Sequence, residues 1–278
     1  MARSRFIAPA RGEVPEAVFA HPIFASYARH HDLLLADAWP EPAMLDARLD
    51  ACSAAGRRLR FSTQDAALLQ DGLHYETRIH NAGLIATRAG NWHDLLNALV
   101  WFEHAALKCA LNLRQVQEIA SVGPRMRSRA QCALTHFDEA GAVVLLEHED
   151  DVKTWDAHDW PRWFGQREAF AQGRIRVHVF GHALLEHALW PGRMATAKCL
   201  VLAGGDTTQW QSHLARAIRD GRVLNDPQEL RPLPLAGLPG WSDAQHQPGF
   251  FDGDMFRPLR PGRVYPRPLR IEPDQLSR

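Results

Sequence analysis

The segment from Asn91 to about Ala120 most constrains the fold of this chain, because it predicts one long, largely apolar helix. When it is placed on a helix at about 100° per residue, apolar side chains cover most of the circumference. They are Leu95, Leu96, Leu99, Val100, Phe102, Ala105, Ala106, Leu107 and Ala110. A helix that is apolar over so wide an arc packs against neighbours on several sides. We therefore expect a buried helix at the centre of the domain.

The remaining elements mix helices and strands without a strict alternation of one with the other. Helices are expected at residues 15–35, 40–55, 181–189 and 207–218, and from Asp159-Trp160-Pro161 onward. Strands are expected at 58–63, at 73–87 with a turn at 81–83, at 175–180 and at 197–202, with a hairpin joining 134–137 to 142–147 through a turn at 138–141. Such a mixture favours α+β over a doubly wound sheet. The prediction is a single α+β domain with a long central buried helix, short antiparallel strands and several flanking helices.

The expected domain covers residues 1–258 of the 278-residue chain, which is long enough to bury a substantial core. Residues 1–13 are predicted to be a flexible lead. Residues 259–278 are rich in proline and arginine and cannot bury enough apolar area to fold alone. We expect these last residues to form an extended tail.

Composition excludes several classes of protein. Lysine plus arginine and aspartate plus glutamate number 32 each, so no net charge favours binding to nucleic acid or to an anionic membrane. Four widely spaced cysteines with no CxxC pair argue against a disulfide framework or a zinc ribbon. The N-terminus lacks the apolar region of a signal peptide, and no apolar run approaches the ~20 residues that span a bilayer. These features predict a cytoplasmic protein that does not enter membranes.

One polar stripe runs along the long helix and has an unusual composition. It consists of His93, Asp94, Asn97, Trp101, His104, Lys108 and Asn112. A stripe that faces solvent would show Glu, Lys and Gln, whereas these residues are costly to bury unless paired and are useful in a cleft. A structural reading stays open: Asn91 is a natural N-cap, Asp94 suits the first turn, and His93 could be a hydrogen-bonded structural histidine.

A second pair, His182 and Glu186, lies about ninety residues further on. The two are four residues apart and share one face of the helix expected after Gly181, so they could bind a divalent metal, or the carboxylate could orient the imidazole. A surface pair is the alternative. The spacing matches no zinc-protease motif.

Other polar residues are weaker candidates for a site. Asp138 and Glu139 are predicted at the tip of the hairpin, where acidic residues are ordinary turn formers, although Asp138 could also act as a base or a ligand. Arg125, Arg127 and Arg129 could bind a phosphate or a carboxylate, or form a solvated basic turn. Residues 204–207 predict a turn with a helix cap. No GxSxG motif supports a serine nucleophile.

Motifs spread over most of the chain match a known pattern. They are Tyr75-Glu76, Thr87-Arg88, Asn91 to Asp94, Asn97-Ala98, Trp101, Lys108, Asn112, Arg125 to Glu139 (with Thr135, Phe137, Asp138 and Glu139), Gly181-His182-Ala183 with Glu186, Pro234 to Trp241, Phe250-Phe251-Asp252, and Phe256-Arg257-Pro258. On these residues the chain resembles a bacterial family of unknown function, numbered 3025 in the domain-of-unknown-function series. The resemblance implies a single family domain and no particular activity.

Two kinds of function agree with these residues. The first is a hydrolase-like enzyme on a small anionic substrate, with His93, Asn97 and Asp138 as catalytic residues and Arg88, Trp101 and Lys108 as substrate-binding residues. In this hypothesis a metal is held by His93, His182 and Glu186, and a bound metal would supply a nucleophilic hydroxide near neutral pH. Imidazole and carboxylate ligands suit zinc, manganese or iron.

The second is a non-catalytic module that binds a small ligand or a protein through the same Trp/Asn/His cleft. A third reading, nucleic-acid binding through the arginines at 125–129 and the tail, predicts strongly salt-dependent affinity, and the zero net charge weighs against it. The sequence predicts no oligomeric state.

Overall fold

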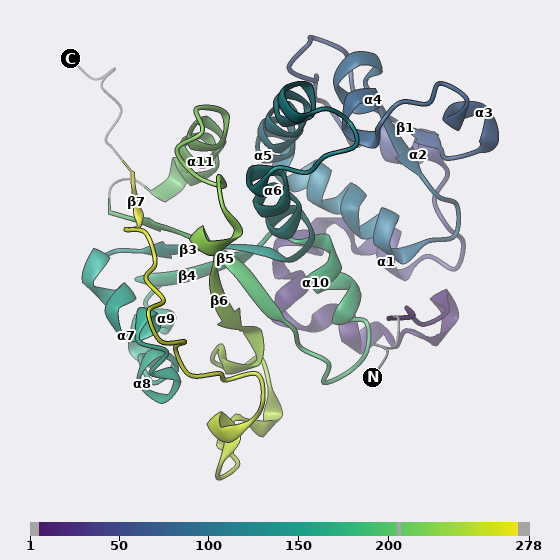
Figure 1. Ribbon diagram of the computed structural model, residues 1–278. Coiled ribbons are helices and arrows are strands. Elements are labelled where there is room, and N and C mark those ends of the chain that lie inside the picture. The colour runs from purple at the N-terminus through teal and green to yellow at the C-terminus, as the bar shows by residue number, and fades with distance from the viewer. Residues whose placement is uncertain (1–5, 205–206, 272–278) are drawn as a thin grey trace.

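The computed structural model describes residues 6–204 and 207–271 and shows an α+β domain, as expected. Residues 1–5 of the predicted lead, Gly205 and Asp206 of the predicted turn, and residues 272–278 of the predicted tail lie outside the described residues. Figure 1 shows a helical half, built largely from the first 122 residues, beside a half that contains the main sheet. Among the described residues, no helix is long and apolar enough to cross a membrane.

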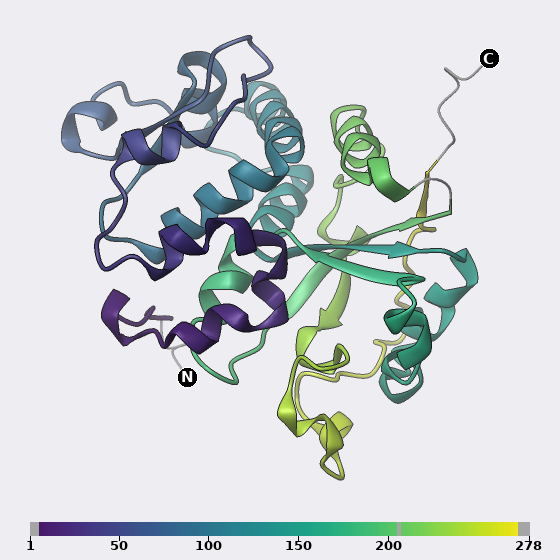
Figure 2. The same cartoon turned by 180° about the vertical axis from the view of Figure 1, so that it is seen from behind.

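The helices lie in both halves and between them. They are α1 (His31–Leu35), α2 (Pro42–Asp46), α3 (Ala66–Leu69), α4 (Tyr75–Ala82), α5 (Trp92–Val122), α6 (Arg129–Ala140), α7 (Val152–Asp156), α8 (Trp160–Phe164), α9 (Arg167–Ala171), α10 (His182–His187) and α11 (Trp210–Arg219). The predicted helix at 15–35 consists largely of two 3₁₀ segments, Glu16–Ala20 and Pro22–His30, which lead into α1. Figure 2 shows these N-terminal turns from behind. The Tyr27 hydroxyl in the second of them donates to the carbonyl of Val179 at 2.8 Å.

The main sheet has five strands that pair in both senses. They are β3 (Gly141–Leu146), β4 (Ile175–Val179), β5 (Thr196–Ala203), β6 (Arg231–Pro234) and β7 (Leu269–Arg270). The order is β4-β3-β5-β6, and β7 pairs with β5 beyond the end of β6. Pairs β3–β5 and β5–β7 are parallel, whereas only antiparallel strands were expected. A separate parallel pair joins β1 (Arg60–Thr63) to β2 (Leu84–Thr87).

Helix α5 is the long buried helix that the sequence predicts. Asn91 caps it by accepting a hydrogen bond from the backbone of Asp94 at 3.0 Å, and Gly123 ends it with a positive φ. The helix is kinked at His104, whose φ of −134° and ψ of 35° are not helical. The polar stripe continues past the kink, because Lys108 and Asn112 line the same cavity as His93, Asn97 and Trp101, whereas His104, at the kink itself, does not line it.

The first strand of two predicted strand pairs was wrong, and both errors affect the site, whereas the second strands are present as β2 and β3. Residues 75–82 form helix α4, because His74 caps its start and Gly83, in the left-handed conformation, ends it. Residues 129–140 form helix α6, which Ser128 and Gln131 start with a reciprocal capping box. Asp138 and Glu139 therefore lie in the last turn of a helix and not at the tip of a hairpin.

The described parts of the predicted lead and tail both contact the body of the domain. Trp92 donates to the carbonyl of Pro9 at 3.1 Å. Near the other end, Arg231 donates to the carbonyl of Pro266 at 2.5 Å, and residues 269–270 form β7 in the sheet.

Candidate functional site

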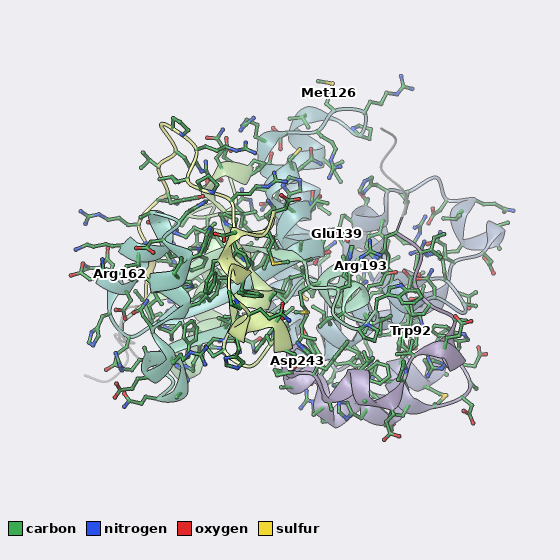
Figure 3. All side chains as sticks on the ribbon, turned by 90° about the horizontal axis from the view of Figure 1, so that it is seen from below. Trp92, Met126, Glu139, Arg162, Arg193 and Asp243 are labelled. Carbon is green, nitrogen blue, oxygen red and sulfur yellow. The ribbon has the colours of Figure 1, made fainter. Side chains whose placement is uncertain are left out.

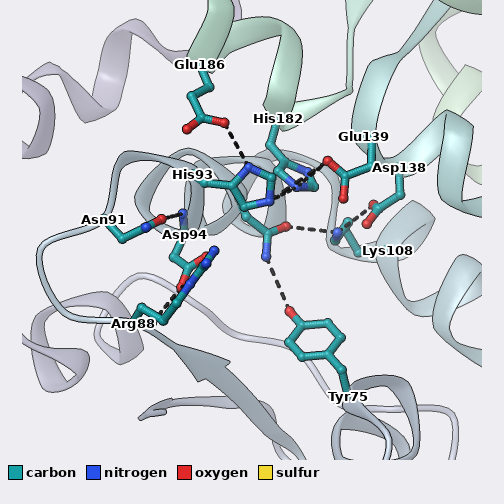
Figure 4. Close-up of polar contacts among 11 residues, drawn as sticks. Tyr75, Arg88, Asn91, His93, Asp94, Lys108, Asp138, Glu139, His182 and Glu186 are labelled. Atoms are coloured by element: carbon teal, nitrogen blue, oxygen red, sulfur yellow. Dashed lines mark hydrogen bonds and ion pairs between the residues drawn. The ribbon is translucent and has the colours of Figure 1, made fainter. Parts of the chain in front are cut away.

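Three side chains from distant parts of the sequence meet between the two halves of the molecule. His93 lies in the first turn of α5, Glu139 in the last turn of α6, and His182 is the first residue of α10. The Nε2 atoms of the two imidazoles are 3.0 Å apart (Figure 4). The Oε2 atom of Glu139 lies 3.5 Å from Nε2 of His182 and 3.9 Å from Nε2 of His93. Figure 3 shows Glu139 near the middle of the view and Met126 at its outer edge.

A glycine makes this convergence sterically feasible. A Cβ atom added to Gly181 would lie 2.4 Å from the backbone nitrogen of Gly141 and 2.5 Å from the carbonyl oxygen of Glu139. Backbone atoms cannot move aside as a flexible side chain does, so a larger residue would separate the start of α10 from the end of α6. Gly181 thus allows His182 to approach Glu139.

The three ligand-type atoms fit a metal ion. The circle through three atoms separated by 3.0, 3.5 and 3.9 Å has a radius of about 2.0 Å, so one point lies at that distance from all three. Zinc binds histidine nitrogen and carboxylate oxygen at about 2.0–2.2 Å. His93, Glu139 and His182 could therefore hold a metal ion. The sequence predicted Glu186 as the carboxylate ligand, whereas Glu139 is the carboxylate that lies beside the Nε2 atoms of both histidines.

Glu186 contacts the other side of the His93 ring. Its Oε2 atom lies 2.9 Å from Nδ1 of His93, whereas Nε2 faces the group of three. A carboxylate that accepts from the second nitrogen of a ligating histidine fixes the orientation of the ring and raises its basicity. His182 and Glu186 thus both reach His93, as their shared helical face suggested, but at opposite nitrogens.

Burial and charge set the protonation of these groups. Burial lowers the pKa of His182 to about 3, so the ring is neutral at pH 7, the form that binds metals. Burial also lowers the pKa of His93, but the hydrogen bond to Glu186 and the charge of Glu139 outweigh it and raise the pKa above its ordinary value. Burial raises the pKa of Glu139.

A chain of hydrogen bonds centres on the buried Lys108. Its Nζ atom donates to Oδ1 of Asp138 at 2.6 Å and to Oδ1 of Asn97 at 2.9 Å, and Asn97 donates to the hydroxyl of Tyr75 at 3.3 Å (Figure 4). Burial alone would raise the pKa of Asp138, but Lys108 and the nearby imidazoles lower it overall. Asp138 is therefore an ionised carboxylate beside the two histidines.

The second cation expected to bind substrate is also paired. Arg88 donates to both carboxylate oxygens of Asp94, at 2.9 and 2.7 Å, and its backbone nitrogen donates to the same group at 2.6 Å. Asp94 thus serves both the start of α5 and this ion pair. The expectation that Arg88 and Lys108 bind an anion is weakened, because each is already matched by a carboxylate.

These residues surround a cavity of about 240 Å³. The predicted catalytic and substrate-binding residues that line it are Arg88, His93, Asn97, Trp101, Lys108 and Asp138. His182 and Glu139 line the same cavity, while Glu186 lines a wider hollow on the other side of His93. Sequence reasoning missed Glu76, whose Oε2 accepts from Asn112 at 2.7 Å inside the cavity. The signal was present, since Asn112 belongs to the stripe and needs a buried partner.

Other candidates lie outside this site. His104 is turned away by the kink, and its Nδ1 lies 3.1 Å from the side-chain oxygen of Gln211. Close by is His178, whose pKa is lowered to about 4 by burial and, to a lesser extent, by the charges of His104 and Arg176. Arg129 forms a bidentate ion pair with Asp226 at the surface.

The comparisons with known proteins name a family and no activity. Residues 59–260 match the family model described as "Protein of unknown function (DUF3025)". No curated protein and no solved structure matches the chain.

Proposed function

The chain belongs to the DUF3025 family, whose description names no activity, and we propose from its geometry that it is a metal-dependent hydrolase. In this proposal His93, Glu139 and His182 hold one divalent ion. The observation that carries it is the point about 2.0 Å from all three ligand atoms, at the edge of a polar cavity.

The ligand set agrees with a catalytic ion. Two imidazoles and one carboxylate leave coordination positions for water or substrate, as in catalytic zinc sites. The same set suits manganese or iron, so the choice of metal is left to experiment. An ion held by these three residues would lower the pKa of a bound water to about 7 and would so supply hydroxide near neutral pH.

The protein groups around the ion receive roles from their contacts. Asp138, an ionised carboxylate beside both imidazoles, accepts the proton of the attacking water. Lys108 positions Asp138 through their hydrogen bond and offsets its negative charge. Asn97 holds Lys108 from the other side, and Arg88 fixes the wall of the cavity through Asp94.

Metal binding is the first test. Tag-free protein is analysed for metal by mass spectrometry, and zinc, manganese and iron(II) are titrated calorimetrically into chelator-treated protein. We expect one ion per chain, and we expect His182→Ala and Glu139→Gln to abolish tight binding. The exposed His148 and Glu147 supply matched controls, His148→Ala and Glu147→Gln, which should bind as the wild type does. Wild-type protein that binds none of the three ions would refute the proposal.

Turnover separates an enzyme from a binding module that uses the same cavity. Metal-loaded protein is assayed against panels of carboxylic esters, amides and phosphate esters. We expect Asp138→Asn to keep the metal and to lose at least a hundredfold in rate, which is typical for a general base. A protein that binds metal and ligand but turns over no member of any panel supports the binding module instead.

A further inference from the structure

Some charged groups around the cavity form ion pairs and one does not. Lys108 is matched by Asp138 and Arg88 by Asp94, so the two cations that line the cavity have no charge to spare. Glu76 is different, because no lysine or arginine of the described chain forms an ion pair with its carboxylate. Its hydrogen-bond partner is the neutral amide of Asn112, at 2.7 Å.

A buried donor on the same cavity also lacks a partner. Trp101 is 1% exposed, and within the described chain its Nε1 finds no hydrogen-bond acceptor. Leaving a buried N–H unpaired costs about 1–3 kcal/mol. Trp101 lines the cavity, and a small turn of its ring toward the cavity would let a ligand oxygen reach Nε1, which has almost no accessible surface in this structure.

These two groups define what the cavity recognises. We infer that its ligand is a small amine: a molecule with an ammonium group for Glu76 and an oxygen acceptor for Nε1 of Trp101. The inference rests on the proposed function, in which the reacting end of the same molecule lies at the metal. A volume of about 240 Å³ corresponds to about eight water molecules, which limits the ligand to a small molecule.

The protonation of Glu76 agrees with this inference. Burial, followed by the charge of Asp138, raises the pKa of the Glu76 carboxyl above its ordinary value. An adjacent ammonium group would lower this pKa again, because an opposite charge favours the ionised form. Binding of an amine should therefore release protons at the pH where Glu76 is partly protonated.

A neighbouring hollow offers the opposite charge preference and must be distinguished. It is lined by Arg125 and Arg127 and shares Glu76, Gln115 and Thr135 with the cavity. Arg127 donates to the hydroxyl of Thr135 at 2.6 Å, and neither arginine forms an ion pair within the described chain. A ligand with an anionic end would use this hollow and not Glu76.

The test uses three hydroxamates that bind zinc through the same group and differ in the charge at the far end. They are 4-aminobutanoyl hydroxamate, pentanoyl hydroxamate and glutaric monohydroxamate, and each is titrated into the zinc-loaded full chain. We expect the amino compound to bind about tenfold more tightly than the neutral one, a factor that corresponds to about 1.4 kcal/mol. The carboxylate compound should bind most weakly.

Variants then identify the groups responsible. Glu76→Gln keeps an acceptor for Asn112 and should abolish the preference for the amine. Trp101→Phe should weaken all three probes by a similar factor, about fivefold for one lost hydrogen bond. The exposed Glu147→Gln is the control, and melting curves establish that each variant is folded.

The outcomes separate this inference from the proposed function. If zinc does not bind, both are wrong. If zinc and the hydroxamates bind but the carboxylate probe is the tightest, or the amine preference survives in Glu76→Gln, only the amine inference is overturned. If the Arg127→Gln variant then fails to bind glutaric monohydroxamate, the carboxylate end of the ligand lies in the neighbouring hollow.

Discussion

Replacing Glu186 by glutamine separates an outer partner of His93 from a direct metal ligand. The Glu186 side chain is 15% exposed, and its carboxylate accepts from Nδ1 of His93 at 2.9 Å. The substitution keeps the size of the side chain and an acceptor oxygen but removes the charge. Hydrogen bonds to charged groups contribute about 1.5–3 kcal/mol, against about 1 kcal/mol for neutral ones. The difference predicts that zinc affinity falls about tenfold, the lower end of the range for outer-shell partners.

The assay is a competition with a chromophoric zinc chelator at constant pH. The wild type, Glu186→Gln, Glu139→Gln and the surface control Glu147→Gln are compared side by side. We expect a tenfold loss in the first variant, complete loss of tight binding in the second and no change in the control. If Glu186→Gln loses zinc as completely as Glu139→Gln does, Glu186 is itself a ligand and its role as an outer partner of His93 is wrong. An unchanged affinity would also contradict the reasoning.

Three further predictions concern the frame around the site. Gly181→Ala should destabilise the fold by about 1–3 kcal/mol through overpacking and should weaken zinc binding. The control is Gly12→Ala, whose Cβ meets no atom within 4 Å and which should change neither property. A normal melting temperature and zinc affinity in Gly181→Ala would contradict the prediction. His178, with a pKa of about 4 when folded and about 6.5 when unfolded, gives stability that is present above pH 6.5 and lost as the pH falls toward 4. From pH 7 to pH 5 the wild type should lose at most about 2 kcal/mol more than His178→Gln in urea unfolding, and equal losses would contradict this. Arg231→Met leaves the Asp156 carboxylate, which accepts two hydrogen bonds from Arg231, without its cation, and should lower the free energy of unfolding by about 3 kcal/mol. A urea midpoint equal to that of the wild type would contradict this prediction.

The sequence predicts α5 well because its signals are local. Asn91 caps the helix and apolar residues surround it, so its start, length and burial follow from pattern alone. The kink at His104 does not, because no proline or glycine marks it in the sequence. The polar stripe was therefore right for His93, Asn97 and Lys108, which line one cavity, and wrong for His104.

The site was harder to predict where secondary structure was assigned wrongly. On a hairpin tip, Asp138 and Glu139 would be near-equivalent turn residues. On helix α6 they point about 100° apart, so Asp138 meets Lys108 while Glu139 meets the two imidazoles. The capping box at Ser128 was the local signal for this helix. The approach of His182 to His93 depends on the packing of α10 against α5, which no local pattern contains.

The direct test of the central claim is a crystal structure of zinc-loaded protein with anomalous scattering measured at the zinc edge. The account predicts one peak within about 2.0–2.2 Å of Nε2 of His93, Nε2 of His182 and a carboxylate oxygen of Glu139, with Glu186 bonded only to Nδ1 of His93. A peak at another place, or ordered zinc-free imidazoles in crystals soaked with excess zinc, would contradict it.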